Sequence, residues 1–421
     1  MPTISRADVV ILGAGIAGLA AARKLAVAGL DVILLEARDR IGGRILTARN
    51  PATDLPIELG AEFVHGRPSE LFDLIHEASL NFFEREGEFV CFENGSLGDC
   101  DFFDDTFQVL DDLPASPDRT FNEFLEQKRL PEHVAARARG YVEGFNAADA
   151  ARIGTAALLK QQQAEEAIDG DRSFRIVEGY DRLPAFLLDR FLTAGGKAHL
   201  NTPATAIHWK SGEVRIETGN SGVPEVCASR AVIALPLGVL QAGTVSIAPH
   251  PPNALAAIHK LAMGSATRIS LLFRDRFWEA SAPNLSFLFA QQQTPPTWWT
   301  VAPNPSPVIT GWIGGPRALS APTGIAFRDK ALATLTAIFR RDDLATLLVG
   351  FHTHDWQADP FSLGAYSYAP KDALHASDDL TIPIENTLYF AGEHTDTTGH
   401  WGTVHGALRS GLRAAAQILE G

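Results

Sequence analysis

Cysteine and positive charge are both scarce in this chain of 421 residues. The three cysteines, Cys91, Cys100 and Cys227, form no CxxC pattern, so neither a disulfide framework nor a cysteine zinc site is expected, and a reducing cytoplasm fits best. Lysine and arginine number 36 against 50 aspartates and glutamates, which gives a formal net charge of −14. Because phosphate binding needs basic patches, nucleic acid is not an expected partner, whereas a cationic ligand would suit this charge.

Long apolar runs are also missing. The longest covers residues 9–22, whereas a helix needs about 20 apolar residues to span a bilayer. The first residues lack the basic and apolar regions of a signal peptide. We therefore expect a cytoplasmic protein with no membrane partner. A hydrophobic content of 46% with 20% charged residues is that of a folded globular chain, long enough for about two or three domains.

The beginning of the chain contains a dinucleotide-binding pattern. A short apolar strand is followed by the turn GAGIAG at residues 13–18, a helix and a second strand that ends at Glu36. Gly13 allows the tight turn, Gly15 lets the backbone approach a pyrophosphate, and Gly18 lets the helix pack closely on the strand. The carboxylate of Glu36 can then bind ribose hydroxyls. The pattern predicts a Rossmann-like α/β fold here.

The residues after Glu36 indicate which dinucleotide is bound. "EARDRIGGRILT" places Arg38, Gly43 and Arg44 after the second strand, and "IELGAEFVHG" follows shortly afterwards. The motif Glu-Ala-Arg-x-Arg-x-Gly-Gly-Arg resembles the signature of the flavin-containing amine oxidases, which include monoamine oxidases, polyamine oxidases and flavin-type histone demethylases. The resemblance implies that FAD, rather than NAD, is bound.

Further matches to this family are spread along the whole chain. They keep their order and approximate spacing from residue 8 to residue 418. The similar segments are "IVEGYDRLPAFL" (176–187), "NTPATAI" (201–207), "AVIALPLGVL" (231–240), "FRDRFW" (273–278), "DWQADPFSLGAYSY" (355–368) and "FAGEHTDTTGHWGTVHGALRSGLRAAAQI" (390–418).

The resemblance implies how FAD would be held. Glu393 is expected near the ribityl phosphate, and Thr403 with Val404 begins a helix whose amides point at the isoalloxazine carbonyl. A positive helix end there favours the anionic reduced ring. Ala365 stands where monoamine oxidases attach FAD through a cysteine, so non-covalent FAD is expected. The residues implied at the cofactor are Gly13, Gly15, Ala17, Gly18, Glu36, Ala37, Arg38, Gly43, Arg44, Gly60, Ala61, Glu62, Phe63, Ala204, Gly392, Glu393, Thr403 and Val404.

Three other matches lie where the family binds its substrate. Trp356 resembles the tryptophan that packs on the flavin, and Tyr366 resembles the aromatic residue beside the substrate nitrogen. An aromatic wall suits an amine through shape and weak cation–π attraction, although both could be ordinary core residues. His65 matches a histidine at the substrate mouth of mammalian-type polyamine oxidases and could equally be a structural hydrogen bonder. The second tyrosine of the monoamine oxidase cage falls at Val404, so that cage is incomplete.

The largest departure from the family is Arg268. Family members carry a lysine in this strand, where it holds a water near flavin N5, and "TRISLLFRDRFW" has arginine instead. Arginine cannot shuttle a proton and has a forked head. Arg268 is nevertheless placed with Trp356, Tyr366 and His65 among the implied catalytic residues. Oxygen is the expected electron acceptor, and Arg268 leaves another acceptor open.

The matching segments are interleaved with stretches of different character. We expect a discontinuous Rossmann-like FAD-binding domain and an α+β substrate domain built on a mixed sheet and helices. The acidic part at residues 92–118 is typical of loops, whereas residues 131–145 and 156–168 are typical of helices. The expected FAD-binding domain comprises residues 1–75, 175–260 and 365–421, and the expected substrate domain comprises residues 76–174 and 261–364.

The implied function is FAD-dependent oxidation of a small-molecule amine. Hydride would pass from the Cα–H bond to flavin N5, the imine would hydrolyse, and oxygen would reoxidise the flavin to give peroxide. Alternatives are a dehydrogenase or desaturase that does not act on amines, an L-amino acid oxidase with Arg67 as carboxylate ligand, and a non-catalytic FAD-binding protein. No metal is expected, because the histidines at 352, 354, 394, 400 and 405 have no partners at a diagnostic spacing. The oligomeric state is left open.

Overall fold

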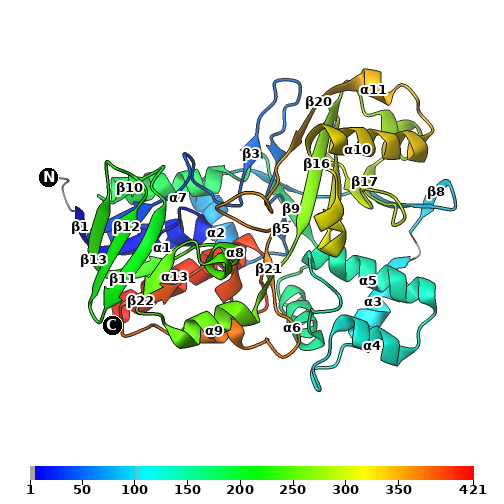
Figure 1. The fold of residues 1–421 in the computed structure, drawn as a ribbon. Helices are drawn as coiled ribbons and strands as arrows, with labels where there is room; N and C mark the ends of the chain where they lie inside the picture. Colours follow the sequence, from blue (N-terminus) through cyan, green and yellow to red (C-terminus); the bar gives the residue numbers. More distant parts are fainter. Residues whose placement is uncertain (1–4, 101) are drawn as a thin grey trace.

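The computed structural model describes residues 5–100 and 102–421 (Figure 1). One layer is an eight-stranded mixed sheet assembled from distant parts of the chain. β1 pairs in parallel with β2 and β13, and β12 pairs in antiparallel with β11 and β13. In spatial order its strands are β10 (Lys197–His199), β2 (Val32–Leu35), β1 (Ser5–Leu12), β13 (Glu225–Ile233), β12 (Glu213–Thr218), β11 (Ala204–Lys210) and β14 (Ser246–Ala248), with β22 (Leu388–Phe390) paired to β13.

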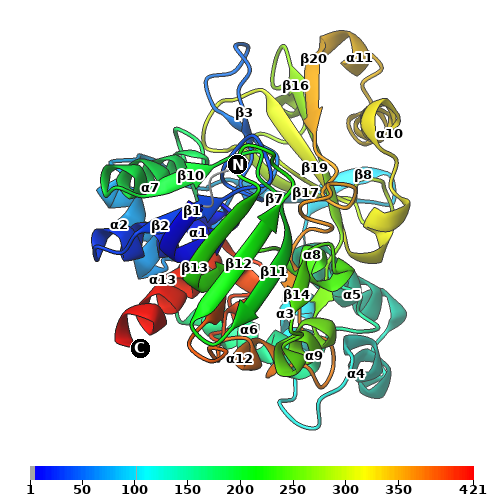
Figure 2. The ribbon, with the colours of Figure 1, turned by 60° about the vertical axis from the view of Figure 1, so that its left-hand side comes forward.

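The first strand, turn and helix form as the sequence pattern predicts. The apolar residues that end β1 are fully buried, because both faces of this central strand are covered. Helix α1 (Ile16–Val27) begins after Gly15 and ends before Gly29, whose φ of 93° is left-handed. On one face of the sheet α1 packs against α7 (Arg182–Thr193) and α13 (Val404–Glu420), so the first and the last helix of the described chain lie side by side (Figure 2).

A second, seven-stranded sheet lies beside the first (Figure 1). β16 has a neighbouring strand on each side and is buried at every position, and α10 (Gly324–Phe339) packs against it. All neighbouring pairs are antiparallel except β17 with β7. In spatial order the strands are β20 (Leu348–Thr353), β16 (Ala266–Phe273), β19 (Val308–Gly314), β18 (Thr297–Trp299), β17 (Leu285–Phe289), β7 (Glu88–Glu93) and β8 (Ser96–Asp99).

Four helices form a separate apolar cluster next to this sheet, at the lower right of Figure 1. They are α3 (Phe102–Asp111), α4 (Phe121–Lys128), α5 (Glu132–Asn146) and α6 (Thr155–Glu166). The two helices expected at 131–145 and 156–168 are present as α5 and α6. The expectation of loops at 92–118 is wrong, because β7, β8 and α3 occupy much of it. Val109 of α3 is buried in this cluster and α3 packs against α5, so tertiary packing favours a helix despite the local acidity.

The remaining elements are short or connect the two sheets. They are β3 (Thr47–Ala48), β4 (Ile57–Glu58), β5 (Val64–His65), α2 (Ser69–Glu77), β6 (Phe82–Glu84), β9 (Ser173–Ile176), α8 (Leu237–Ala242), α9 (Pro252–Lys260), β15 (Ala262–Met263), α11 (Leu344–Leu347), β21 (Ser367–Tyr368), α12 (Ala376–Asp379) and 3₁₀ turns at Phe277–Ala280, Gly315–Ser320 and Glu393–Thr395. The division into an FAD-binding and a substrate domain stays a prediction. It is compatible with the two large sheets, because the strands of the eight-stranded sheet fall within the expected FAD-binding segments and those of the seven-stranded sheet within the expected substrate segments.

A disulfide joins Cys91 to Cys100, which the cysteine pattern did not lead us to expect. The antiparallel turn between β7 and β8 brings the two Cα atoms to 5.1 Å, whereas Cys227 stays free on β13. The two cysteines are nine residues apart in the sequence, and this spacing alone does not show that they form a disulfide. The register of the hairpin is what brings them together. In the part of the chain that the structure describes, no helix combines the length and apolar character needed to cross a bilayer.

Candidate active site

A cavity of about 1500 Å³ is lined by both sheets and by helices α5 and α6. It begins at the carboxyl ends of β1 and β2 and continues to β16, β17 and β18. With the exception of Gly18, every residue that the sequence implied at the cofactor lines this cavity, and so do Trp356, Tyr366, His65 and Arg268. Residues from all parts of the chain therefore meet in one site.

The glycine turn at one end of the cavity has room for a phosphate group. A Cβ on Gly15 would meet no atom within 4 Å, whereas a Cβ on Gly18 would lie 1.9 Å from the carbonyl oxygen of Gly13. Gly15 is thus open to the cavity, and Gly18 is required by the contact of helix and turn. Helix α1 has no side-chain cap and no acidic residue in its first turn. Its positive end is therefore available to an anion.

Glu36 lies beside this turn as the pattern predicts. Its carboxylate accepts hydrogen bonds from the backbone N–H groups of Ala14, at 2.8 Å, and Arg38, at 2.9 Å. The Arg38 guanidinium in turn donates to Asp359 at 2.7 Å. These contacts orient Glu36 at the end of β2, where a ribose of a dinucleotide would lie. The turn, the helix end and the carboxylate together fit a dinucleotide cofactor.

Glu393 lines the cavity and is bonded to several protein groups. It accepts hydrogen bonds from Arg44 Nη1 at 2.9 Å, from Ser367 Oγ at 2.6 Å and from the Gly402 backbone N–H at 2.9 Å. Burial opposes ionisation of Glu393, but Arg44, His394 and the Ser367 hydrogen bond together outweigh burial and lower the pKa of the carboxyl. Glu393 therefore fixes the loop before α13 as an ionised group, and its contact with a ribityl phosphate stays a prediction.

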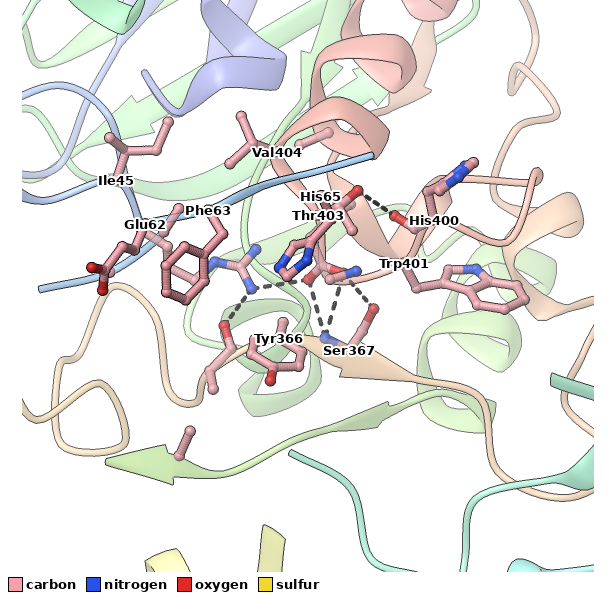
Figure 3. A pocket seen from close by; sticks show the side chains of 18 of the residues that line it. Ile45, Glu62, Phe63, His65, Tyr366, Ser367, His400, Trp401, Thr403 and Val404 are labelled. Atoms are coloured by element: carbon pink, nitrogen blue, oxygen red, sulfur yellow. Dashed lines mark hydrogen bonds and ion pairs between the residues drawn. The ribbon is translucent and has the colours of Figure 1, made fainter. Parts of the chain in front are cut away.

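The start of α13 faces the cavity. Thr403 is its N-cap, because its hydroxyl oxygen accepts from the Gly406 N–H at 3.0 Å and donates to the carbonyl of His400 at 2.7 Å. The first turn of the helix carries no acidic side chain. Thr403 and Val404 both line the cavity, so a positive helix end opens into it (Figure 3).

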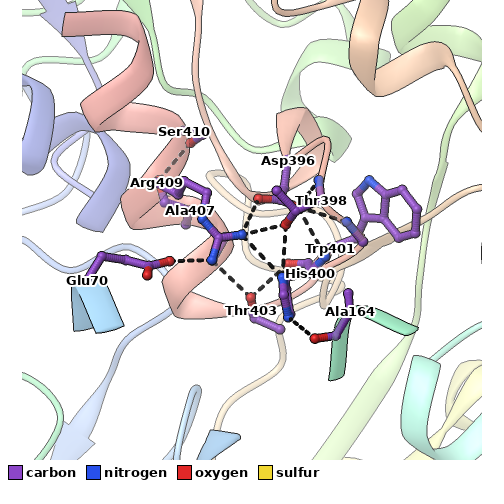
Figure 4. Close-up of polar contacts among 12 residues, drawn as sticks. Glu70, Ala164, Asp396, Thr398, His400, Trp401, Thr403, Ala407, Arg409 and Ser410 are labelled. Carbon is purple, nitrogen blue, oxygen red and sulfur yellow. Dashed lines mark hydrogen bonds and ion pairs between the residues drawn. The ribbon is translucent and has the colours of Figure 1, made fainter. Parts of the chain in front are cut away.

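A polar network supports the loop that leads to Thr403 (Figure 4). Arg409 pairs with Glu70 and, at 3.3 Å, with Asp396. Asp396 accepts from the backbone N–H of His400 at 3.0 Å, and the His400 ring contacts the carbonyl oxygen of Ala164 at 3.1 Å. The network therefore ties α13 to α2 and α6 and holds the loop at the cavity wall.

The far end of the cavity is an aromatic chamber formed by Phe63, His65, Phe145, Trp299 and Tyr366. The ring of Phe63 lies 5.6 Å from Trp299 and 5.9 Å from His65. The Tyr366 hydroxyl donates to the carbonyl of Phe145 at 2.6 Å. Burial, with a smaller effect of Arg85, lowers the pKa of His65 to about 4, so the imidazole is neutral at neutral pH.

Trp356 and Arg268 hold the backbone that connects the cofactor end with this chamber. Trp356 donates from its indole N–H to the carbonyl of Leu59 at 2.9 Å, and Arg268 Nη1 donates to the carbonyl of Gly60 at 3.0 Å. Arg268 also pairs with Glu62 at 2.6 Å. Both residues that the sequence pointed to are thus at the site, but each is bonded to the main chain of the same segment.

The sequence pattern did not point to several residues of the chamber. Phe287 and Trp299 lie on β17 and β18, and the guanidinium of Arg85 lies 4.2 Å from the ring centroid of Phe287 and 4.7 Å from that of Phe63. The aromatic residues in "LSFLF" and "TWW" are the feature of the sequence that could have indicated this chamber. The sequence does not show which face of these strands lines the cavity. Arg67 is exposed and lies outside the cavity wall, so the candidate carboxylate ligand of an L-amino acid oxidase is not at this site.

Metal-ligating side chains are not gathered anywhere in the described residues: no group of three or more histidine, cysteine, aspartate or glutamate side chains could hold an ion. His354 pairs with Asp359 at 2.9 Å, and the ring of His405 packs on His400 at 4.6 Å between centroids. These histidines therefore have other neighbours.

Known proteins resemble this chain over nearly its whole length. The model of the family described as flavin containing amine oxidoreductase matches residues 16–171 and 96–419. Polyamine oxidase 4 of Oryza sativa subsp. japonica is 29% identical over 99% of this chain and 90% of its own length. Wild-type putrescine oxidase, solved bound to putrescine, has a TM-score of 0.84 at 21% identity over 100% of both chains. Cyclohexylamine oxidase from Brevibacterium oxydans IH-35A has a TM-score of 0.83 at 22% identity over 98% of this chain and 99% of that one.

Proposed function

Because the chain belongs to the family of flavin containing amine oxidoreductases, with FAD as the cofactor, we propose that it is an oxidase that converts an amine to an imine and passes the electrons to oxygen. When bound, FAD supplies the acceptor for the hydride of the Cα–H bond at its N5. Water hydrolyses the imine to an aldehyde or ketone and ammonia or an amine. Oxygen takes up the two electrons and is released as hydrogen peroxide.

The observation that carries this proposal is the continuity of one cavity from the glycine turn to the aromatic chamber. The first end fits the dinucleotide, and the second end offers apolar rings to a neutral amine. Catalysis by hydride transfer depends mainly on orientation and on exclusion of water. We assign Tyr366 and Trp356 to orienting the substrate and shielding it from water, and His65, which is neutral, to hydrogen bonding.

The charge of the cavity lining also supports an amine as substrate. Glu165, Glu166, Asp169 and Asp171 lie along the cavity on and after α6. Carboxylates near an entrance attract cations and raise their local concentration. Burial raises the pKa of Glu165 to about 7, so this group changes charge near neutral pH. The relatives named above as polyamine and putrescine oxidases act on compounds of this charge type.

Two further properties belong to this proposal. FAD is held without a covalent bond, because residue 365 is alanine and none of the three cysteines lines the cavity. As part of this proposal the enzyme works in the cytoplasm.

An anaerobic absorbance titration tests the proposal. Purified protein with bound FAD is mixed with monoamines, diamines, polyamines, acetylated polyamines and L-amino acids, and air is then admitted. We expect one class of amine to bleach the visible flavin band, and air to restore it with one peroxide for each flavin. If the flavin is bleached but does not recover in air, the electron acceptor is a compound other than oxygen. If no amine reduces the flavin, the proposal that the protein oxidises amines is wrong.

Tyr366 offers a matched pair of variants for the same assay. Tyr366→Ala removes the ring from the chamber, and we expect kcat/KM to fall by about tenfold or more, which corresponds to about 1.4 kcal/mol of transition-state binding. Tyr366→Phe removes only the hydroxyl that contacts Phe145 and should stay much closer to the wild type. Equal losses in both variants would mean that the hydroxyl, and not the aromatic wall, is what matters.

A further inference from the structure

Arg268, Glu62 and Arg175 form a buried charged cluster on the wall of the cavity, which we call the arginine–glutamate cluster. Glu62 accepts from Arg268 Nη2 at 2.6 Å through one carboxylate oxygen and pairs with Arg175 Nη1 at 2.9 Å through the other. The indole N–H of Trp299 donates to the same carboxylate at 3.1 Å. The exposed fractions are 3% for Arg268, 6% for Glu62 and 3% for Arg175. All partners come from different elements, so the fold builds this cluster.

The cluster has an excess of positive charge. Two guanidinium groups share one carboxylate, and Arg85 is close enough to influence both Glu62 and Arg175. Burial opposes ionisation of Glu62, but Arg175 and Arg268 outweigh burial and lower the pKa of this carboxyl, so it is charged. Glu58 also interacts with Arg175 and Glu62, but burial raises its pKa to about 7, so it compensates the charge of the cluster only in part. In a medium of low dielectric such an excess acts strongly on neighbouring groups.

The cluster also holds the segment that runs through the cavity wall. Arg268 Nη1 binds the carbonyl of Gly60, and Nη2 binds Glu62, two residues further along. A Cβ on Gly60 would lie 1.8 Å from the carbonyl oxygen of Arg44, so this segment is packed tightly against the cofactor end of the site. Both terminal nitrogens of Arg268 therefore donate hydrogen bonds to protein groups. A guanidinium in this state does not release a proton.

We propose that Arg268 is a positioning residue whose fixed positive charge, set by its pair with Glu62, stabilises the negative charge of reduced FAD and orients the segment Gly60–Phe63 along the cofactor. This role rests on the proposed function only in requiring bound FAD. It differs from proton transfer or water holding by a lysine, because the charge is permanent and the hydrogen bonds go to the protein.

The midpoint potential of bound FAD tests this proposal without any amine. It is measured by chemical reduction in the presence of reference dyes, so the result is independent of the substrate and of oxygen. Arg268→Met removes a positive charge and should shift the potential to a more negative value. Glu62→Gln removes a negative charge with nearly unchanged shape and should shift it to a more positive value. Arg268→Lys keeps the charge and should give a smaller shift than Arg268→Met.

Arg328→Met is the matched control, because Arg328 lies on α10, outside the cavity wall, and pairs with Asp329. It changes the net charge by the same amount as Arg268→Met and should leave the potential unchanged. Shifts of the same sign in Arg268→Met and Glu62→Gln, or no shift in either, would overturn the proposal. If amines fail to reduce the wild-type flavin while the opposite shifts are found, the proposed function fails and this inference stands.

Stability of the apoprotein gives a second readout if a single variant folds poorly. Removing Arg268 alone or Glu62 alone breaks a buried ion pair, whereas Arg268→Met/Glu62→Gln removes both partners. The double variant should therefore lose less thermal stability than the sum of the single losses, and its flavin potential should lie between those of the single variants. Additive losses would mean that the two side chains are not coupled, which contradicts the proposal.

Discussion

Single glycines in the first turn serve two different purposes. Gly15 has an ordinary φ of −70° and open space where a Cβ would point, whereas Gly18 has the carbonyl oxygen of Gly13 at 1.9 Å from its Cβ position. The first glycine therefore leaves room for a ligand, and the second leaves room for the protein itself. The two roles predict different consequences for the same substitution.

Gly18→Ala should destabilise the apoprotein, and Gly15→Ala should not. Overpacking in a tight interior costs about 1–3 kcal/mol, which we expect for Gly18→Ala in chemical denaturation. Gly15→Ala should keep the stability of the apoprotein but raise the Kd for FAD by about tenfold, equivalent to about 1.4 kcal/mol. Isothermal titration with FAD and urea unfolding of both variants distinguish these outcomes. A stable Gly18→Ala variant would show that the helix can shift away from the turn.

Helix α13 forms part of the cavity wall, and its positive N-terminal end faces the cavity. Its position is set from outside by Arg409, which pairs with Glu70 on α2 and with Asp396 in the preceding loop. Its first turn is set by the Thr403 cap. The apolar face of the helix packs against α1, so the two helix ends that would contact FAD belong to one packed pair.

Thr403→Ala should remove the cap and lower the free energy of unfolding by about 1 kcal/mol. Thr403→Ser retains a hydroxyl that can accept from Gly406 and should stay near the wild type. Because the cap fixes the helix end at the cavity, the alanine variant should also bind FAD more weakly than the serine variant. Urea unfolding with and without FAD measures both effects, and equal behaviour of the two variants would show that the hydroxyl does not determine the helix start.

In the described chain the two largest sheets and a helical cluster surround the cavity, and several titratable groups are buried in the molecule. His394 is fully buried, and in the described part of the chain neither ring nitrogen has a hydrogen-bond partner. Burial lowers the pKa of His394 from 6.5 to about 4. The native state therefore disfavours the charged imidazole.

The expected result is a loss of stability in acid. The unfolded chain takes up a proton at His394 near pH 6.5 and the folded chain only near pH 4, so the stability present above pH 6.5 falls as the pH drops through this window. The difference between a pKa of 6.5 and one of about 4 corresponds to about 3 kcal/mol of stability. His394→Leu should flatten this part of the curve when the apoprotein is unfolded by urea at several pH values. Glu58 and Glu165 titrate in the same range with the opposite sign, but they are common to both proteins and cancel in the difference. Parallel curves for the two proteins would contradict the assignment.

The cofactor end of the site could be read from the sequence because its determinants are local. The turn at Gly13, the start of α1 and Glu36 follow one another along the chain, so a short motif specifies both the backbone and the chemistry. The family match confirms the resemblance drawn from these motifs, and with it FAD, and the likeness to solved amine oxidases confirms the Rossmann-like α/β fold. The roles of the individual residues stay predictions.

The tertiary structure decided the substrate end. Arg268 and Glu62 are 206 residues apart, and Arg85 meets Phe287 only because β17 pairs with β7. The same holds for Cys91 and Cys100, which depend on a hairpin, and for α3, which packs against α5. Such contacts depend on strand register and on packing between distant segments, and no short stretch of sequence contains either. The local motifs of the sequence therefore determine that the chain binds FAD. The charge and shape of the cavity around the cofactor and the amine are determined by the tertiary structure, because they depend on packing between distant segments.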